Sequence, residues 1–187
     1  MVPAPPSQVL PADEPVEVVD ADGVVLSVVS RGAMRAANER HRVTYVVVRD
    51  HAGAVLVHQR AAWKDIWPSR WDLAFGGVCA VGEAWRDAAL RELSEEAGIA
   101  ADPQRFVDFG PVRFESAETR VVGRAYGIEH EGPFAFADGE VVAHRWVVPA
   151  ALRDWAATHL LCADAVALVV PLVLDAWCDE KVTRAAH

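Results

Sequence analysis

The feature that most constrains the fold is a helical segment that carries three glutamates beside an apolar stripe. The pattern predicts a helix from about Glu83 to Ala97, followed by Gly98, because glycine commonly takes the positive-φ position after a helix. At about 100° per residue, Glu92, Glu95 and Glu96 share an arc of roughly 100°, and the apolar residues lie beside that arc. One edge of this helix must therefore pack on a core while a tight acidic cluster borders it.

The acidic cluster needs a physical reason. Like charges four residues apart destabilise a helix by a few tenths of a kcal/mol, and acids near its C-terminal end oppose the helix dipole. A hard divalent cation such as Mg²⁺ or Mn²⁺ relieves both penalties because it prefers carboxylate oxygens. For an isolated E-x-x-E-E pattern, the alternative interpretation is a solvated acidic face.

Around this helix, apolar runs and turn residues predict alternating strands and helices, which is typical of an α/β or α+β chain with a mixed sheet. Strands are expected at 16–19, 24–29, 43–48, 54–58, 71–75, 106–114, 120–128 and 141–147, and further helices at 31–39, 149–159 and 163–177.

The length of 187 residues suits one domain. Five of the eleven prolines lie in the first fifteen residues, which predicts a disordered arm over 1–15 and a single domain over 16–180. The three cysteines have no metal-site spacing, and we find neither a secretory signal nor a membrane span, so a cytoplasmic protein is expected. With 18 basic and 27 acidic residues, the net charge of −9 argues against a broad nucleic-acid-binding face.

The spacing around the helix matches, at every fixed position, the pattern G-x5-E-x7-R-E-U-x-E-E-x-G-U, in which U is a bulky aliphatic residue. The fixed positions are Gly77, Glu83, Arg91, Glu92, Leu93, Glu95, Glu96, Gly98 and Ile99. This is the Nudix box, and the sequence resembles a Nudix hydrolase over about residues 16–147. Below, "the box" means residues 77–99.

The resemblance implies an α/β/α sandwich with a mixed β-sheet, in which a loop–helix–loop carries the box. It also implies hydrolysis of a diphosphate linked to another moiety, usually a nucleoside, with Mg²⁺ or Mn²⁺ as cofactor. Carried onto this chain, Glu92, Glu95 and Glu96 are the metal ligands. Arg91 orients Glu92 and its neighbours, and Glu83 pairs with Arg91 or joins an outer metal shell. Gly77 and Gly98 allow tight backbone on either side of the helix.

The chemistry agrees with these roles, because metal ions neutralise diphosphate oxygens and a nearby carboxylate accepts a proton from the attacking water. Glu92 is expected to be a ligand that also helps to activate water. Outside the box, spacing alone leaves Glu115, Glu118 and Glu140 as equal candidates for the general base.

Upstream, the segment from His58 to Trp71 resembles one shared by isopentenyl-diphosphate isomerases and a nearby branch of Nudix hydrolases. The resemblance implies that Arg60 and Lys64 face the substrate diphosphate, whereas the alternative is ordinary surface charge. Trp63, Trp67 and Trp71 lie in the same segment, where a tryptophan can stack on a nucleobase or simply anchor the loop.

Two other functions remain open. An isomerase would use Cys79, but this chain has Cys-Ala-Val-Gly in place of the isomerase Cys-Gly-His-Pro, and Arg120 stands where an acid is wanted. This makes Cys79 a small apolar filler in our interpretation. The second alternative is a non-catalytic ligand-binding module. We expect a small phosphorylated metabolite as the partner, no nucleic acid and no membrane, and the valine-rich hairpin and C-terminal helices suit a homodimer.

Overall fold

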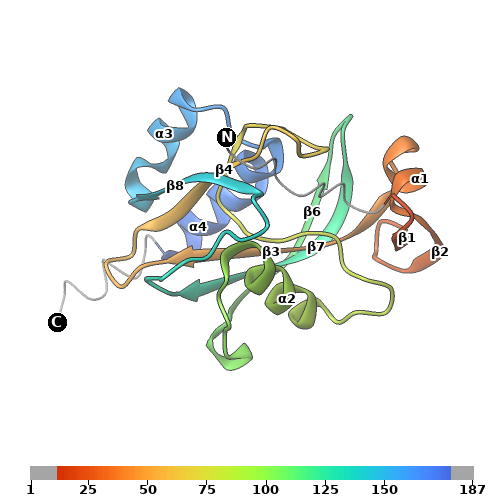
Figure 1. Cartoon of the computed structure of the whole chain (residues 1–187), viewed down its shortest axis with the longest axis horizontal. Coiled ribbons are helices and arrows are strands. Elements are labelled where there is room, and N and C mark those ends of the chain that lie inside the picture. The colour runs from red at the N-terminus through yellow and green to blue at the C-terminus, as the bar shows by residue number, and fades with distance from the viewer. Residues whose placement is uncertain (1–11, 178–187) are drawn as a thin grey trace, which may run out of the picture.

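The computed structural model describes residues 12–177, which form one eight-stranded mixed sheet with helices on both faces (Figure 1). The strands are β1 (Pro15–Val19), β2 (Val25–Ser30), β3 (Arg40–Arg49), β4 (Val55–Arg60), β5 (Trp71–Asp72), β6 (Val107–Glu115), β7 (Arg120–Glu129) and β8 (Val141–Val147). The α-helices are α1 (Arg31–Ala36), α2 (Trp85–Ala97), α3 (Leu152–Thr158) and α4 (Val170–Trp177). Two short 3₁₀ turns, η1 (Pro103–Arg105) and η2 (Pro149–Ala151), and one π-helical turn, η3 (Ala165–Val169), complete the chain.

Strand β3 organises the molecule. Along one edge it pairs in parallel with all of β7, from Arg40 opposite Arg120 to Arg49 opposite Glu129. Its other edge is shared, because β1 pairs only near its start and β4 only at its end. Between these two strands, residues 75–79 run beside β3, and the Thr44 N–H donates to the Gly77 carbonyl at 3.0 Å. The sheet therefore opens at the point where the box begins.

The two faces of the sheet are covered by different helices, as the period-two alternation of β3 requires. Val46 and Val48 face α2, where they pack in one core with Ala89, Leu93 and Ala97. Val47 faces the opposite core, which contains residues of η3 and α4. Figure 1 shows α2 on one side of the sheet and α3 and α4 on the other. The predicted α/β/α sandwich with a mixed sheet is confirmed.

The helix of the box begins two residues later than predicted, at Trp85. Glu83 still belongs to the preceding turn, because its backbone N–H donates to the Ala80 carbonyl. It ends at Ala97, and Gly98 follows with φ +69° and an N–H bonded to the Ser94 carbonyl. A Cβ on Gly98 would also lie 2.7 Å from the Cβ of Ala135. Both its backbone conformation and its close neighbour therefore require glycine here.

Other predicted boundaries were wrong for local reasons. The helix expected over 31–39 ends at Ala36, because Asn38 adopts φ +46°. The strand expected over 71–75 stops at Asp72. The helix expected over 149–159 opens with the 3₁₀ turn η2 and ends at Thr158, whereas the segment expected over 163–177 is helical throughout, with the π turn η3 inside it. The remaining elements match their predicted ranges to within three residues.

The predicted domain limits, 1–15 for the arm and 16–180 for the domain, are only partly covered by residues 12–177. Residues 1–11 of the predicted arm and 178–180 of the predicted domain lie outside the described residues, and Pro15 already belongs to β1. β2 is the last strand on its side of the sheet and exposes Val25, Leu26 and Val28. An exposed apolar edge of this kind is compatible with the predicted homodimer, which stays a prediction. Within 12–177, no helix has the length and apolar character needed to cross a membrane.

Candidate active site

A cavity of about 520 Å³ lies on the acidic edge of α2, where the sheet is open. Its wall comes from segments far apart in the sequence, including α1, β3, the loop after β4, α2 and the residues before β8. The predicted metal ligands and the predicted substrate-binding residues all line this cavity, namely Glu92, Glu95, Glu96, Arg60 and Lys64. The fold thus brings together side chains that sequence reasoning had placed in two separate motifs.

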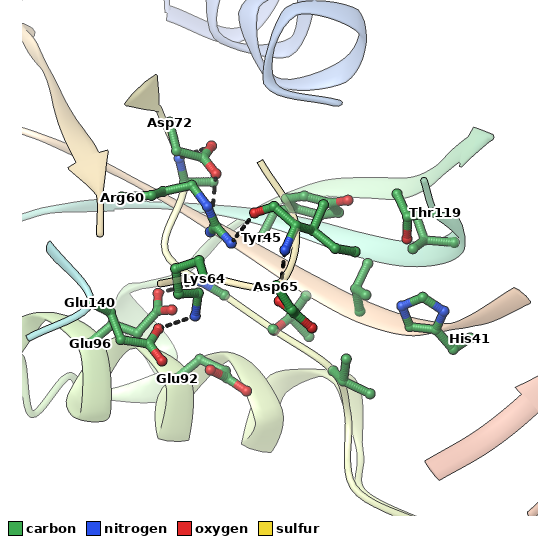
Figure 2. A pocket seen from close by; sticks show the side chains of 18 of the residues that line it. His41, Tyr45, Arg60, Lys64, Asp65, Asp72, Glu92, Glu96, Thr119 and Glu140 are labelled. Atoms are coloured by element: carbon green, nitrogen blue, oxygen red, sulfur yellow. Dashed lines mark hydrogen bonds and ion pairs between the residues drawn. The ribbon is translucent and has the colours of Figure 1, made fainter. Parts of the chain in front are cut away.

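The three box glutamates differ in their surroundings. Glu96 is buried, and its Oε2 accepts a hydrogen bond from the Gly76 N–H at 3.0 Å. The Glu92 side chain is 12% exposed and that of Glu95 is 58% exposed. Glu92 and Glu96 point from α2 into the cavity (Figure 2). Within residues 12–177, the three do not form a group whose ligand atoms all lie within 4.8 Å, so their joint metal ligation stays a prediction.

Gly77 closes one side of this acidic edge. A Cβ built on Gly77 would lie 2.7 Å from Glu92 Oε1 and 2.8 Å from the carboxyl carbon. The Glu92 carboxylate therefore occupies the space that any larger residue would take. This close approach gives the first glycine of the box a direct role in placing a carboxylate.

Arg91 holds the outer side of the cluster. Its guanidinium donates from Nε and Nη2 to the two oxygens of Glu83, at 3.0 and 2.9 Å. Its Nη1 donates to Glu92 at 2.8 Å and to Glu95 at 3.1 Å. Because of the Arg91 hydrogen bonds, the pKa of Glu83 is lowered, while the pKa of Arg91 is raised by the same partner. Of the two places predicted for Glu83, this geometry has it paired with Arg91.

Glu140 meets Glu96 at the other side of the cluster. Lys64 Nζ forms an ion pair and hydrogen bond with Glu140, and the Glu140 carboxyl also hydrogen-bonds to Glu96. Burial, and then the nearby charge of Glu92, raises the pKa of Glu96 well above its usual range. Burial raises the pKa of Glu92 as well. Burial acts to raise the pKa of Glu140 too, but the charge of Lys64 and the hydrogen bonds from Lys64 and Glu96 outweigh it, so the pKa of Glu140 is lowered. Glu96, which is buried between two other carboxylates, is therefore the acid of this group that least readily carries a negative charge.

The geometry separates the three candidate bases outside the box. Glu140 lines the cavity, whereas Glu115 and Glu118 do not. Glu115 ends β6 and pairs with Arg40, and Glu118 accepts a hydrogen bond from the Ser116 hydroxyl in the turn before β7. Of these three acids, only Glu140 is placed to act beside the box.

A second polar group, which sequence reasoning missed, lies beyond Arg60. Arg60 Nη1 is 3.8 Å from Asp72, and the ligand atoms of Asp72, Cys162 and Asp164 lie within 4.8 Å of one another. All three residues are buried, and Tyr45 donates its hydroxyl proton to Asp164 at 3.0 Å. Burial, together with the charge of Asp72, raises the pKa of Asp164 to about 7. Cys162 thus contributes to a buried polar cluster.

These residues carried weak signals in the sequence. Asp164 lies in the first turn of a helical segment, where an acid is common for local reasons, and its side chain accepts from the Ala165 N–H. Asp72 stood out only as a charge between apolar neighbours in a predicted strand. Their shared site depends on contacts between residues far apart in the chain, which no local pattern records.

The tryptophans and Cys79 divide between packing and exposure. Trp67 is buried, and Trp71 packs edge-on against Trp155 at 5.0 Å between ring centroids. Of the three tryptophans in the 63–71 segment, Trp63 alone is exposed. Cys79 is buried outside the cavity lining, and burial raises its pKa to about 12. A thiolate nucleophile is therefore disfavoured at Cys79.

The sequence of this chain is similar to those of known proteins. A family model described as NUDIX domain matches residues 39–163. An uncharacterized Nudix hydrolase of Yersinia pestis is 40% identical over 134 residues, which cover 72% of each chain. The uncharacterized Nudix hydrolase YfcD of Escherichia coli K12 is 39% identical over 140 residues, covering 75% of this chain and 77% of that protein.

Solved structures share the fold at lower identity. DR0079 of Deinococcus radiodurans is 21% identical and superposes with a TM-score of 0.70, covering 88% of this chain and 99% of that one. The NUDIX domain of Shewanella oneidensis NrtR, solved in complex with ADP ribose, is 16% identical with a TM-score of 0.58 and covers 76% and 96%.

Proposed function

The chain belongs to the Nudix family as a Nudix hydrolase, and on that premise we propose that it cleaves a diphosphate linkage in a small nucleoside-diphosphate-type metabolite with the help of Mg²⁺ or Mn²⁺. The likeness to the NrtR domain concerns the fold alone, but the ADP ribose bound to that domain belongs to the proposed substrate class.

One observation carries the proposal: a buried carboxylate, Glu96, meets two further carboxylates, Glu92 and Glu140, in a cavity that also contains Arg60 and Lys64. The burial and mutual repulsion that raise the pKa of Glu96 create a demand for positive charge at this edge of α2. A purely structural acidic face would instead be solvated.

The residues fit a hard divalent cation. The available ligands at this edge are carboxylate oxygens, which Mg²⁺ and Mn²⁺ prefer over nitrogen or sulfur. Glu92, Glu95 and Glu96 would hold the metal, and Glu95, which is exposed and hydrogen-bonded to Arg91, would turn inward to reach it. When bound, the metal supplies charge neutralisation of the diphosphate and lowers the pKa of a coordinated water.

The remaining residues bind the diphosphate and handle the proton. Arg60 and Lys64 are cations on the cavity wall, suited to phosphate oxygens of the substrate. Glu140 is held by Lys64 with a lowered pKa, so it is available as a carboxylate that accepts the proton of the attacking water. Glu92 is the alternative base inside the box. Arg91 keeps Glu92 and Glu95 oriented through its fixed guanidinium geometry.

The test is hydrolysis of nucleotide, nucleotide-sugar and isoprenoid diphosphates, followed by phosphorus NMR and phosphate release with Mg²⁺ or Mn²⁺. We expect cleavage of nucleoside diphosphate derivatives that stops when EDTA is added. Glu96→Gln should lose at least about 100-fold in kcat while staying folded, because it removes a charge at nearly constant shape.

Glu118→Gln is the matched control, since Glu118 is an exposed glutamate outside the cavity. It should keep the wild-type rate. Full activity in Glu96→Gln would contradict the ligand assignment. Isoprenoid turnover without phosphate release would favour an isomerase, and tight binding without turnover would favour a binding module.

A further inference from the structure

A buried ion pair holds the loop that leads into α2. We call residues 80–84 the box loop; it reaches β1, where Ala80 pairs with Val16, at the end of the sheet formed by β1 and β2 (Figure 1). In the middle of β1, the Glu17 side chain is 9% exposed and pairs with Arg42 of β3. Glu17 precedes residues 39–163, which the family model matches, so membership of the family assigns it no role.

Both carboxylate oxygens of Glu17 accept hydrogen bonds. Oε2 accepts from Arg42 Nη1 at 2.8 Å, and Oε1 accepts from the Gly82 N–H at 2.9 Å. Any residue with the backbone conformation of Gly82 would donate the same N–H. The hydrogen bond from Arg42 outweighs the effect of burial and lowers the pKa of Glu17. Glu17 is therefore a buried carboxylate in a fixed position, and its loss would leave the charge of Arg42 unpaired.

Arg42 connects Glu17 to the box loop. Its Nη2 donates to the Glu83 carbonyl at 2.9 Å, and its guanidinium lies over the Trp85 ring, 4.1 Å from the centroid. Trp85 is the first residue of α2. Because the guanidinium is planar and its Nη1 is bound to Glu17, the direction of Nη2 is fixed as well. The Glu83 main chain is therefore held in place from outside the box.

The place of the Glu83 main chain decides where its carboxylate lies. Both oxygens of this carboxylate accept from Arg91, through Nε and Nη2. Arg91 in turn donates to Glu92 and Glu95, two of the predicted metal ligands. Continuous hydrogen bonds thus connect Glu17 to the acidic edge of α2, although Glu17 itself does not line the cavity.

We propose that Glu17 is a positioning residue of the active site, which acts through Arg42 and Glu83 to hold Arg91 against the metal-ligating glutamates. The inference rests on the proposed function, because it concerns the same metal ligands. The alternative is an ion pair that only stabilises β1 on β3. The two roles differ in one respect: positioning requires the contact between Glu83 and Arg91, whereas stabilising the sheet does not.

Glu17→Gln tests the proposal, because glutamine keeps the size and can accept from the Gly82 N–H but offers Arg42 no charge. The first measurement uses neither metal nor substrate. Proton–nitrogen NMR follows the Arg91 Nε–H, which donates to Glu83 and should exchange with water about fivefold faster in the variant, the size of one lost hydrogen bond. Calorimetry follows Mn²⁺, and its Kd should rise by about the same factor.

A double-mutant cycle with Glu83→Gln distinguishes the two roles. Glu83→Gln removes the charged contact with Arg91, so the later part of the series no longer depends on Glu17. In that background, Glu17→Gln should change the Kd of Mn²⁺ by less than about twofold, because the two residues act in series. Fully additive effects would overturn the positioning role, and so would an unchanged Arg91 Nε–H exchange and Mn²⁺ affinity in Glu17→Gln.

Asp108→Asn is the matched control. Asp108, on β6 outside the cavity, also accepts from an arginine, Arg124, and from a glycine N–H, that of Gly110. It should keep the wild-type Arg91 exchange and Mn²⁺ affinity, and a loss as large as that of Glu17→Gln would overturn the proposal.

A second variant guards against misfolding around an unpaired arginine. The double variant Glu17→Gln with Arg42→Gln leaves no buried charge without its partner, so urea unfolding should show a folded protein. It should still show the faster Arg91 exchange and the weaker Mn²⁺ binding, because nothing then holds the Glu83 carbonyl as Arg42 did. Wild-type values of both in this folded variant would overturn the positioning role.

The positioning role and the proposed hydrolysis fail separately. If the protein binds no Mn²⁺ and cleaves no diphosphate, the proposed function fails, while faster Arg91 exchange in Glu17→Gln but not in Asp108→Asn still supports the action of Glu17 on Arg91. If Mn²⁺-dependent hydrolysis is found and Glu17→Gln leaves Arg91 exchange and Mn²⁺ affinity unchanged, the positioning role alone is overturned.

Discussion

Replacing Gly77 with alanine should separate activity from stability. In the structure, the added Cβ would lie 2.7 Å from Glu92 Oε1, closer than real Cβ atoms approach an oxygen. The backbone at Gly77 is not in the left-handed region, so alanine is accommodated there without backbone strain. The carboxylate of Glu92 must therefore retreat, while the main chain stays in place.

The size of the effect follows from that displacement. Restoring an ordinary contact of about 3.4 Å moves the carboxylate by roughly 0.7 Å, and misplacement of about 1 Å in a reacting group can cost 100-fold in rate. We expect kcat/KM to fall by about 100-fold, which corresponds to about 3 kcal/mol of transition-state stabilisation. The free energy of unfolding should stay the same or rise by up to about 1 kcal/mol, because alanine restricts the unfolded chain.

The assay combines steady-state hydrolysis with urea unfolding of the metal-free protein. Gly82→Ala is the control, since Gly82 has φ +72° but no atom within 4 Å of its added Cβ. It should lose stability through backbone strain and keep its activity. A Gly77→Ala enzyme with wild-type kcat/KM would refute the argument that this glycine places Glu92, and an unfolded variant would refute the assumed backbone compatibility.

Three further predictions concern individual side chains. His58 is buried with its pKa lowered to about 4 by burial, so the unfolded chain takes up the proton first and stability should fall from pH 6.5 towards pH 4. This effect is worth about 3 kcal/mol for one histidine, so His58→Gln should lose that part of the pH dependence and keep the part due to His41, whose pKa burial also lowers to about 4, measured by urea unfolding at several pH values. Gly98→Ala should lower the free energy of unfolding by about 1–3 kcal/mol at constant pH, because of its positive φ and the contact with Ala135. Glu140→Gln should lower kcat by at least about tenfold, whereas Glu115→Gln should leave kcat unchanged in the same hydrolysis assay.

The sequence predicted the parts of the fold that depend on local pattern. The helix over 85–97 followed from its apolar stripe and from Gly98, and both signals act within a few residues. Errors arose where one residue changed the backbone, as at Asn38, or where a predicted strand lost its partner, as after Asp72. The sequence did not show that residues 75–79 lie beside β3. They pair there because β1 and β4 contact β3 only near its two ends and leave its middle free on that edge.

The candidate site shows the same division. Glu92, Glu95 and Glu96 share one arc because helical geometry fixes the relative directions of side chains three and four residues apart, so the sequence alone determined the acidic edge and the family. The choice of Glu140 over Glu115 and Glu118, and the presence of Arg35 and Asp164 in the cavity, were decided only by the tertiary structure. Which elements face one another depends on strand order and on the packing of distant segments, and periodicity within one element carries no information about its neighbours in space.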